Sequence, residues 1–152
     1  MMELTAFDKA LLNLLQGSLP IGKRPFAKMA EELGTDEERV ISRLRLLKDE
    51  GCLRRIGTFF DSSRLGYGGT LVALRVAEGK VASVAEAVNR YPGVTHNYER
   101  EGKFNLWFTL LTPNLETEKE ILSEVEALPG VERLLNLKTT KKYKINVQFQ
   151  LS

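Results

Sequence analysis

The sequence is poor in the residues on which many enzymes and metal proteins depend. Cysteine occurs once, as Cys52, which excludes an internal disulfide, a cysteine-rich zinc site and a CxxC redox pair. Histidine also occurs once, as His96. No apolar run approaches the roughly 18 residues that a membrane span needs, so we expect no membrane partner. Neither sign of charge dominates: 22 basic and 20 acidic side chains leave a net charge of +2. This balance does not by itself indicate nucleic-acid binding.

Missing motifs narrow the choice of function further. The sequence contains no Walker-type loop, no HExxH and no GxSxG. It begins with acidic and amphipathic residues instead of a basic segment and an apolar block, so we expect no secretory signal and a cytoplasmic protein. The composition, 43% hydrophobic and 28% charged, is typical of a soluble globular chain. The length of 152 residues allows one ordinary domain or two small ones.

Residues 1–60 have the pattern of three short helices and a hairpin. Apolar residues recur at helical spacing, and each of the three segments ends at a glycine: Gly17, Gly34 and Gly51. The stretch from Cys52 to Phe60 is typical of strand sequence. This order predicts a winged helix-turn-helix domain over residues 1–60.

Residues 61–68 are dominated by turn formers and are interpreted as a linker. Beyond them the pattern alternates: strand 70–77, helix 81–91, strands 94–100 and 104–112, helix 115–128 and strand 131–138. This βαββαβ series predicts a ferredoxin-like domain over residues 69–152, and an α+β class for the whole chain. Residues 141–151 alternate again and are expected to add an edge strand or to pair across a dimer.

A helix-turn-helix followed by a ferredoxin-like domain resembles the Lrp/AsnC regulators over nearly the full chain. Gly51-Cys-Leu-Arg-Arg-Ile-Gly and Leu65-Gly-Tyr look like that family's wing and linker. The segment His96-Asn-Tyr-Glu-Arg100 is similar to the His-Asn-Tyr-x-Arg motif of siroheme decarboxylases, and Arg54-Arg-Ile-Gly-Thr-Phe-Phe-Asp61 also looks like that branch. The resemblance implies a lyase that removes the carboxyl groups of two acetate arms of siroheme, giving didecarboxysiroheme on the way to haem or haem d1. It also implies a heterodimer of homologous subunits and no cofactor beyond the iron of the substrate.

Strand alternation places His96, Tyr98 and Arg100 on one face of the sheet, with Asn97 and Glu99 on the other. Neutral imidazole suits an iron porphyrinoid, and a guanidinium matches a carboxylate. We therefore expect His96 to be the axial ligand or the proton donor, and Tyr98 and Arg100 to orient carboxylates. The alternative is that a solitary strand histidine is only half exposed or bonded to a neighbour.

A run of cations is the second signal, because siroheme carries carboxylate arms around an apolar macrocycle. Between residues 133 and 144 five side chains are basic and none is acidic: Arg133, Lys138, Lys141, Lys142 and Lys144. We interpret them as anchors for substrate arms. In a strand, Lys142 and Lys144 would share one face and Lys141 would lie on the other. The alternative, weighed equally, is that lysines on a terminal strand blunt a sheet edge.

Aromatic residues are candidates for the apolar walls of such a site. Phe104, Trp107 and Phe108 lie on one predicted strand, and Trp107 is included among the substrate-binding candidates. For Trp107 we favour the alternative, that it fills the core.

The third predicted helix tests DNA binding. Between Asp36 and Glu50 it has four basic and five acidic residues, a sum of −1, with acids in its first turn. Counterion release at phosphates needs a surplus of clustered cations, so we expect DNA not to be a partner. Two alternatives stay open: a ligand-sensing Lrp/AsnC transcription regulator, and a haem-sensing module without catalysis.

Overall fold

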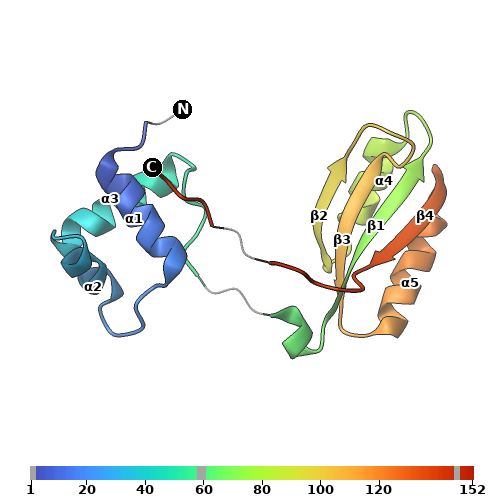
Figure 1. Ribbon diagram of the computed structural model, residues 1–152. Helices are drawn as coiled ribbons and strands as arrows, with labels where there is room; N and C mark the ends of the chain where they lie inside the picture. Colours follow the sequence, from blue (N-terminus) through green and yellow to red (C-terminus); the bar gives the residue numbers. More distant parts are fainter. Residues whose placement is uncertain (1–2, 58–60, 146–147) are drawn as a thin grey trace. The chain divides into compact units, whose positions relative to one another are not determined.

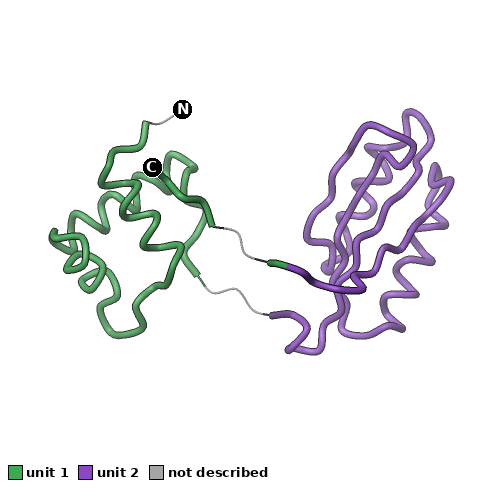
Figure 2. The backbone as a smooth tube through the Cα atoms, in the orientation of Figure 1, with its two compact units in different colours: residues 1–58, 144–152 green, residues 59–143 purple. Residues whose placement is uncertain are grey.

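The chain forms two compact units, and the computed structural model describes residues 3–57, 61–145 and 148–152 (Figure 2). The helical unit comprises Met1–Thr58 with Lys144–Ser152, and the sheet unit comprises Phe59–Tyr143. The sequence had placed all of residues 69–152 in one domain, whereas contacts group the last nine with the helices. No helix within the described ranges is long and apolar enough to cross a membrane.

Three helices build the helical unit: α1 (Ala6–Gly17), α2 (Pro25–Glu32) and α3 (Glu37–Asp49) (Figure 1). Thr5 and Asp8 form a capping box at the start of α1, and Asp36 caps α3 by accepting from the backbone of Arg39. The apolar faces meet in a core that buries Leu11, Leu12, Met29, Ala30, Val40, Leu44 and Leu47. The helix predictions for residues 1–51 are confirmed.

The predicted wing differs in the part that is described. Residues 52–57 form no strand, and Thr58 to Phe60 lie outside the described residues. Leu53 instead packs on the helical core, and its backbone N–H donates to the carbonyl of Leu47 at 2.9 Å. Leu53, one of the apolar residues that suggested a strand, therefore packs at the end of α3. Periodicity alone does not distinguish a short strand from an apolar segment that packs on helices.

Residues 148–152 lie along α1, and the described residues of the expected edge strand, 141–145 and 148–151, form no strand; pairing across a dimer stays a prediction. The side-chain amide of Asn13 exchanges hydrogen bonds with both backbone groups of Leu151, at 2.9 and 3.1 Å. Gln16 does the same with Phe149, at 3.0 and 2.7 Å. Leu151 also packs against the helical core. The described end of the segment, residues 148–152, is therefore held by side chains of α1 and not by a neighbouring strand.

The sheet unit begins with a short 3₁₀ helix, η1 (Ser62–Leu65), and continues as β1 (Gly68–Val76), α4 (Val81–Val88), β2 (Val94–Glu99), β3 (Leu106–Thr112), α5 (Leu115–Glu126) and β4 (Val131–Lys138). The strands form one antiparallel sheet in the order β2-β3-β1-β4. Figure 1 shows α4 and α5 together on one face. The predicted ferredoxin-like fold is confirmed: the ends of several elements move, and η1 lies within residues that were interpreted as a linker.

The two faces of the sheet differ in burial. Val72, Leu74, Phe108 and Leu110 are buried against α4 and α5. The alternate residues face the other way and are here called the open face, since within the described residues of this unit no helix packs on them. The strand register assigns to the open face Leu71, Ala73, Arg75, His96, Tyr98, Trp107, Thr109, Leu111, Arg133, Leu135 and Leu137.

The start of β2 is fixed by a close approach of two chains. A Cβ atom at Gly93 would lie 2.1 Å from the carbonyl oxygen of Leu111, so only glycine fits there. The register then shifts between Val94, opposite Leu110, and His96, opposite Thr109. This β-bulge makes Thr95 the extra residue of the strand.

Candidate functional site

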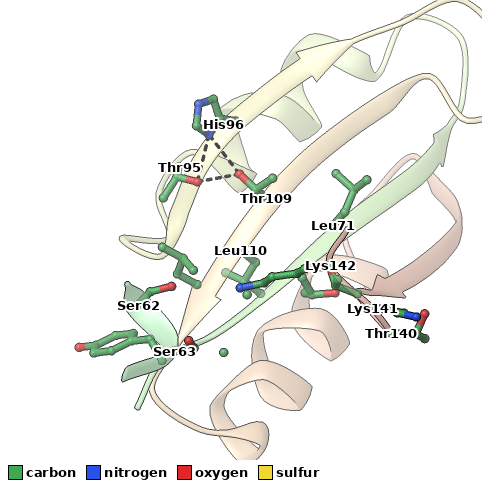
Figure 3. A pocket seen from close by; sticks show the side chains of 16 residues that line it. Ser62, Ser63, Leu71, Thr95, His96, Thr109, Leu110, Thr140, Lys141 and Lys142 are labelled. Atoms are coloured by element: carbon green, nitrogen blue, oxygen red, sulfur yellow. Dashed lines mark hydrogen bonds between the residues drawn. The ribbon is translucent and has the colours of Figure 1, made fainter. Parts of the chain in front are cut away.

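A pocket of about 630 Å³ lies at one end of the open face, within the sheet unit (Figure 3). Its volume is within the roughly 300–1,000 Å³ typical of small-molecule sites. The lining comes from η1, from the start of β1, from β2 and β3, and from the segment after β4: Ser62, Ser63, Tyr67, Gly68, Gly69, Thr70, Leu71, Thr95, His96, Thr109, Leu110, Leu111, Thr139, Thr140, Lys141 and Lys142.

His96 lies at the rim of this pocket, beside two threonine hydroxyls (Figure 3). Its Nδ1 is 3.2 Å from Oγ1 of Thr95 and 3.3 Å from Oγ1 of Thr109. The two hydroxyl oxygens are 2.6 Å apart. The bulge brings Thr95 to the same face as His96, which simple alternation of side chains does not predict.

Tyr98 and Arg100 continue the face on which His96 lies. The rings of His96 and Tyr98 stack with centroids 6.1 Å apart and planes inclined by 28°. The guanidinium of Arg100 lies 5.4 Å from the centre of the Trp107 ring. Asn97 points the other way and donates to the carbonyl of Ala85. The predicted division of the motif between two faces therefore holds, although neither Tyr98 nor Arg100 lines the pocket.

The five predicted cations do not form one group. Lys141 and Lys142 both line the pocket, and Figure 3 shows Lys142 extending across the strands while Lys141 turns outward. Lys138 pairs with the buried carboxylate of Glu118 at 2.9 Å and so faces the helices. Arg133 lies opposite Arg75, towards the other end of the strands. Lys144 belongs to the helical unit. The predicted strand faces of the lysines are wrong, because residues 139–145 form no strand.

The aromatic walls also require correction. Phe108 is buried in the core and cannot line a site on the surface. Trp107 does not fill the core: it lies on the open face, half-buried, and its indole N–H donates to the carbonyl of Phe104 at 2.7 Å. The apolar surface next to the pocket comes from Leu71 and Leu111. The reason is register: even-numbered residues of β3 face the helices and odd-numbered ones do not.

Several pocket residues were missed by the sequence reading. Residues 61–68 were interpreted as a linker, yet Ser62, Ser63 and Tyr67 line the pocket. Hydrogen bonds from Ser63 first, and also the charge of Lys142, hold the pKa of Asp61 below its usual value. Turn-forming residues carried the only signal, and turn composition does not distinguish a linker from a pocket wall.

Metal ligation can be assessed from the donor set. Among the described residues, no group of three or more His, Cys, Asp or Glu side chains is placed to hold a metal ion.

Comparison with known proteins agrees with this architecture. A model described as AsnC-like ligand binding domain matches residues 64–144, and one described as siroheme decarboxylase NirDL-like HTH domain matches residues 8–54. The siroheme decarboxylase alpha subunit of Desulfovibrio desulfuricans is 40% identical over 98% of this chain and 86% of that protein.

Solved structures add the fold and a ligand complex. The siroheme decarboxylase NirDL, crystallised with an iron-uroporphyrin III analogue, is 36% identical with a TM-score of 0.70, and the alignment covers 91% of this chain and 46% of NirDL. AsnC of E. coli has a TM-score of 0.84 at 15% identity, over 97% of this chain and 99% of AsnC, which shows the fold alone. Both domain matches and the identity along nearly the whole sequence show that the chain belongs to the siroheme decarboxylase family, on an AsnC-like frame.

Proposed function

We propose that this chain is a subunit of a siroheme decarboxylase, which removes the carboxyl groups of two acetate arms of siroheme to give didecarboxysiroheme. The observation that carries the proposal is the pocket at the end of the open face. There the only imidazole of the chain, the two lysines Lys141 and Lys142, and several hydroxyl groups lie around one hollow.

The open face matches the chemistry of an anionic macrocycle. Its middle is apolar, with Leu71, Trp107 and Leu137 on neighbouring strands. Cations lie at both ends: Lys141 and Lys142 near the pocket, and Arg100 and Arg133 towards the other end, where Arg75 is already paired with Glu132 at 2.7 Å. An apolar ring with carboxylates on its rim needs this combination, because desolvated carboxylates require charged partners and the ring requires apolar contact.

The reaction is redox-neutral and needs a proton for each arm. An arm R–CH₂–COO⁻ loses CO₂, the electron pair of the broken bond passes into the pyrrole, and one proton completes the methyl group. The macrocycle is the electron sink, so the protein must hold the arm, remove water from the carboxylate and supply the proton. We assign carboxylate orientation to Arg100 and Tyr98, and anchoring of other arms to Lys142, Lys141 and Arg133.

We further propose that a homologous chain completes the enzyme as a heterodimer. The relative from D. desulfuricans is named an alpha subunit, and this chain aligns with less than half of NirDL. A single imidazole cannot readily ligate iron and protonate two separate arms, so the partner subunit supplies the missing group. The open face, with Leu71, Tyr98 and Leu137 exposed, offers apolar surface for contact.

The helical unit supports a role other than DNA binding. On α3, Arg43 forms two hydrogen bonds with the buried Asp8, at 2.8 and 2.6 Å, and Arg39 lies 4.7 Å from the centre of the Phe7 ring. These cations serve the fold. We expect duplex DNA to bind no more tightly than about 10⁻⁶ M, the non-specific range. A steeply salt-dependent nanomolar affinity in fluorescence anisotropy would favour the regulator instead.

One assay tests the function. The chain is incubated anaerobically with siroheme, alone and with a homologous subunit, and the tetrapyrrole is followed by mass spectrometry. We expect the loss of one and then two CO₂ units in the presence of the partner. Binding without loss of mass would identify a haem-sensing module, and neither binding nor loss of mass would reject the proposal.

A further inference from the structure

The contact of His96 with Thr95 and Thr109 contains information about the protonation of the imidazole. Nδ1 is almost equidistant from the two hydroxyl oxygens, at 3.2 and 3.3 Å. The oxygens are 2.6 Å from each other, a hydrogen bond that uses the hydrogen of one hydroxyl. Nδ1 therefore contacts two hydroxyl groups that are already hydrogen-bonded to each other.

The hydrogen count favours one tautomer. If Nδ1 carried the lone pair, it could accept from only one hydroxyl, since one of the two hydrogens is already used between the threonines, and the second short distance would be unexplained. If Nδ1 carries the proton, it can donate to both oxygens at once, because each keeps a lone pair. Two nearly equal N···O distances are typical of such a shared donor.

We propose that Thr95 and Thr109 are positioning residues that hold His96 as the Nδ1–H tautomer, leaving the lone pair on Nε2 for the iron of the substrate. Histidines that bind metal almost always donate their other ring N–H to an acceptor, and here the hydroxyl pair is that acceptor. Nε2 lies on the side of the ring away from the two threonines (Figure 3). This role deepens the proposed function and rests on it. It also assigns His96 as ligand, so the methyl proton comes from another group.

The tautomer can be measured without substrate, because the full chain contains a single histidine. Long-range ¹H–¹⁵N correlation spectra of ¹⁵N-histidine protein, at alkaline pH where the ring is neutral, distinguish the protonated ring nitrogen from the other by chemical shift. We expect the Nδ1–H pattern, whereas free histidine favours Nε2–H. An Nε2–H pattern in the unaltered protein would overturn the proposal.

Variants test whether the threonines are the cause. The Thr95→Val/Thr109→Val double variant keeps shape but removes both hydroxyls, and we expect its spectrum to change to Nε2–H. The Thr95→Ser/Thr109→Ser variant restores the acceptors and should restore Nδ1–H. Thr139→Val is the matched control, since Thr139 lines the same pocket without a hydrogen bond to His96 in the described structure. Persistence of Nδ1–H in the double valine variant would overturn the role of the pair. If that variant fails to fold, the Thr95→Ala/Thr109→Ala variant, which also removes both hydroxyls, provides the same test.

Binding of iron-uroporphyrin gives a second readout. Loss of such a supporting partner typically weakens metal binding by about 10–100-fold, and we expect that loss for the double valine variant with rescue by the serine variant. Unchanged affinity in the valine variant would count against the proposal. The decarboxylation assay tests the proposed function separately from the tautomer. If the free protein shows Nδ1–H but no siroheme is decarboxylated, the enzymatic function is rejected and the tautomer assignment still stands.

Discussion

The helical unit and the sheet unit use their charged side chains differently. In the helical unit, two cations of α3 stabilise the fold: Arg43 pairs with the buried Asp8 and Arg39 lies over the Phe7 ring. The other two, Arg45 and Lys48, line a pocket of about 400 Å³ that contains no histidine. In the sheet unit, Lys141 and Lys142 line a pocket that also contains His96. A sequence motif therefore indicates the fold. The contacts that the charged side chains make in the structure indicate where a ligand can bind.

His96 provides the largest expected effect. The His96→Ala variant removes the only imidazole of the pocket and the proposed iron ligand. Since loss of a supporting residue alone costs about 10–100-fold, we expect turnover to fall by more than about 100-fold, with a changed absorption spectrum of the bound tetrapyrrole. If the spectrum and the turnover are both unaltered, the active site does not lie on the open face. The proposed difference in ligand binding between the two units would then be wrong.

The division among the cations can be tested next. Replacing Lys141 and Lys142 together by glutamine should weaken iron-uroporphyrin binding by at least about 100-fold at low salt, because hydrogen bonds to charged groups contribute about 1.5–3 kcal/mol each. The difference should shrink as salt is added. Lys138→Gln is the control: its partner is Glu118, so we expect lower stability with unchanged affinity. If Lys138→Gln weakens iron-uroporphyrin binding as much as the double lysine variant does, the proposed separation of pocket lysines from Lys138 is wrong.

The ion pair of the helical unit predicts a local loss of stability. Asp8→Asn removes the buried carboxylate that pairs with the partly exposed Arg43, and we expect a cost of about 1.5–3 kcal/mol in the free energy of unfolding. Hydrogen exchange should increase in α1 and α3 and not in β1. The exposed pair of Arg24 with Glu37 gives the control, since Glu37→Gln should cost no more than about 1 kcal/mol.

The same carboxylate predicts a pH dependence. Hydrogen bonds from Arg43, together with those from Thr5, lower the pKa of Asp8 from 3.8 to about 2. A depressed pKa in the folded state stabilises the fold above pH 3.8, and this stabilisation is lost as the pH falls through about 2. The helical unit of the unaltered chain should therefore lose stability as the pH falls from about 4 to about 2. The free energy of unfolding of Asp8→Asn, measured by denaturation at a series of pH values, should not show this acid-dependent loss. If both proteins show the same pH dependence, Asp8 is not its cause.

The smallest expected effect concerns the C-terminal segment. Replacing Asn13 and Gln16 by alanine removes the amides that pair with Leu151 and Phe149. We expect a local cost of about 1–2 kcal/mol, seen as faster exchange of the two backbone amides, while the amides of β1 in the same sample stay unchanged. Equal protection in both proteins would show that packing of Leu151 alone holds the segment.

Much of the frame could be predicted from the pattern of residues. Periodicity placed the three N-terminal helices and the βαββαβ order, and β4 has the predicted ends. Alternation also placed His96 and Tyr98 on one face. These features depend on local spacing, which is visible in sequence. The strand at residues 52–57 was wrong because Leu53 joins the helical core, a choice that depends on distant residues.

The order of the elements, the single imidazole and the motif around it follow from the chain's residues alone, because helical and strand periodicity and residue identity are local properties. The folded arrangement was needed to see that a bulge at Thr95 places a second hydroxyl beside His96, and that Lys142 lines the pocket while Lys138 faces the helices. Strand register explains this difference. One extra residue in a strand, or the end of a strand after Lys138, changes which face a side chain takes, and pairing with neighbouring strands sets both.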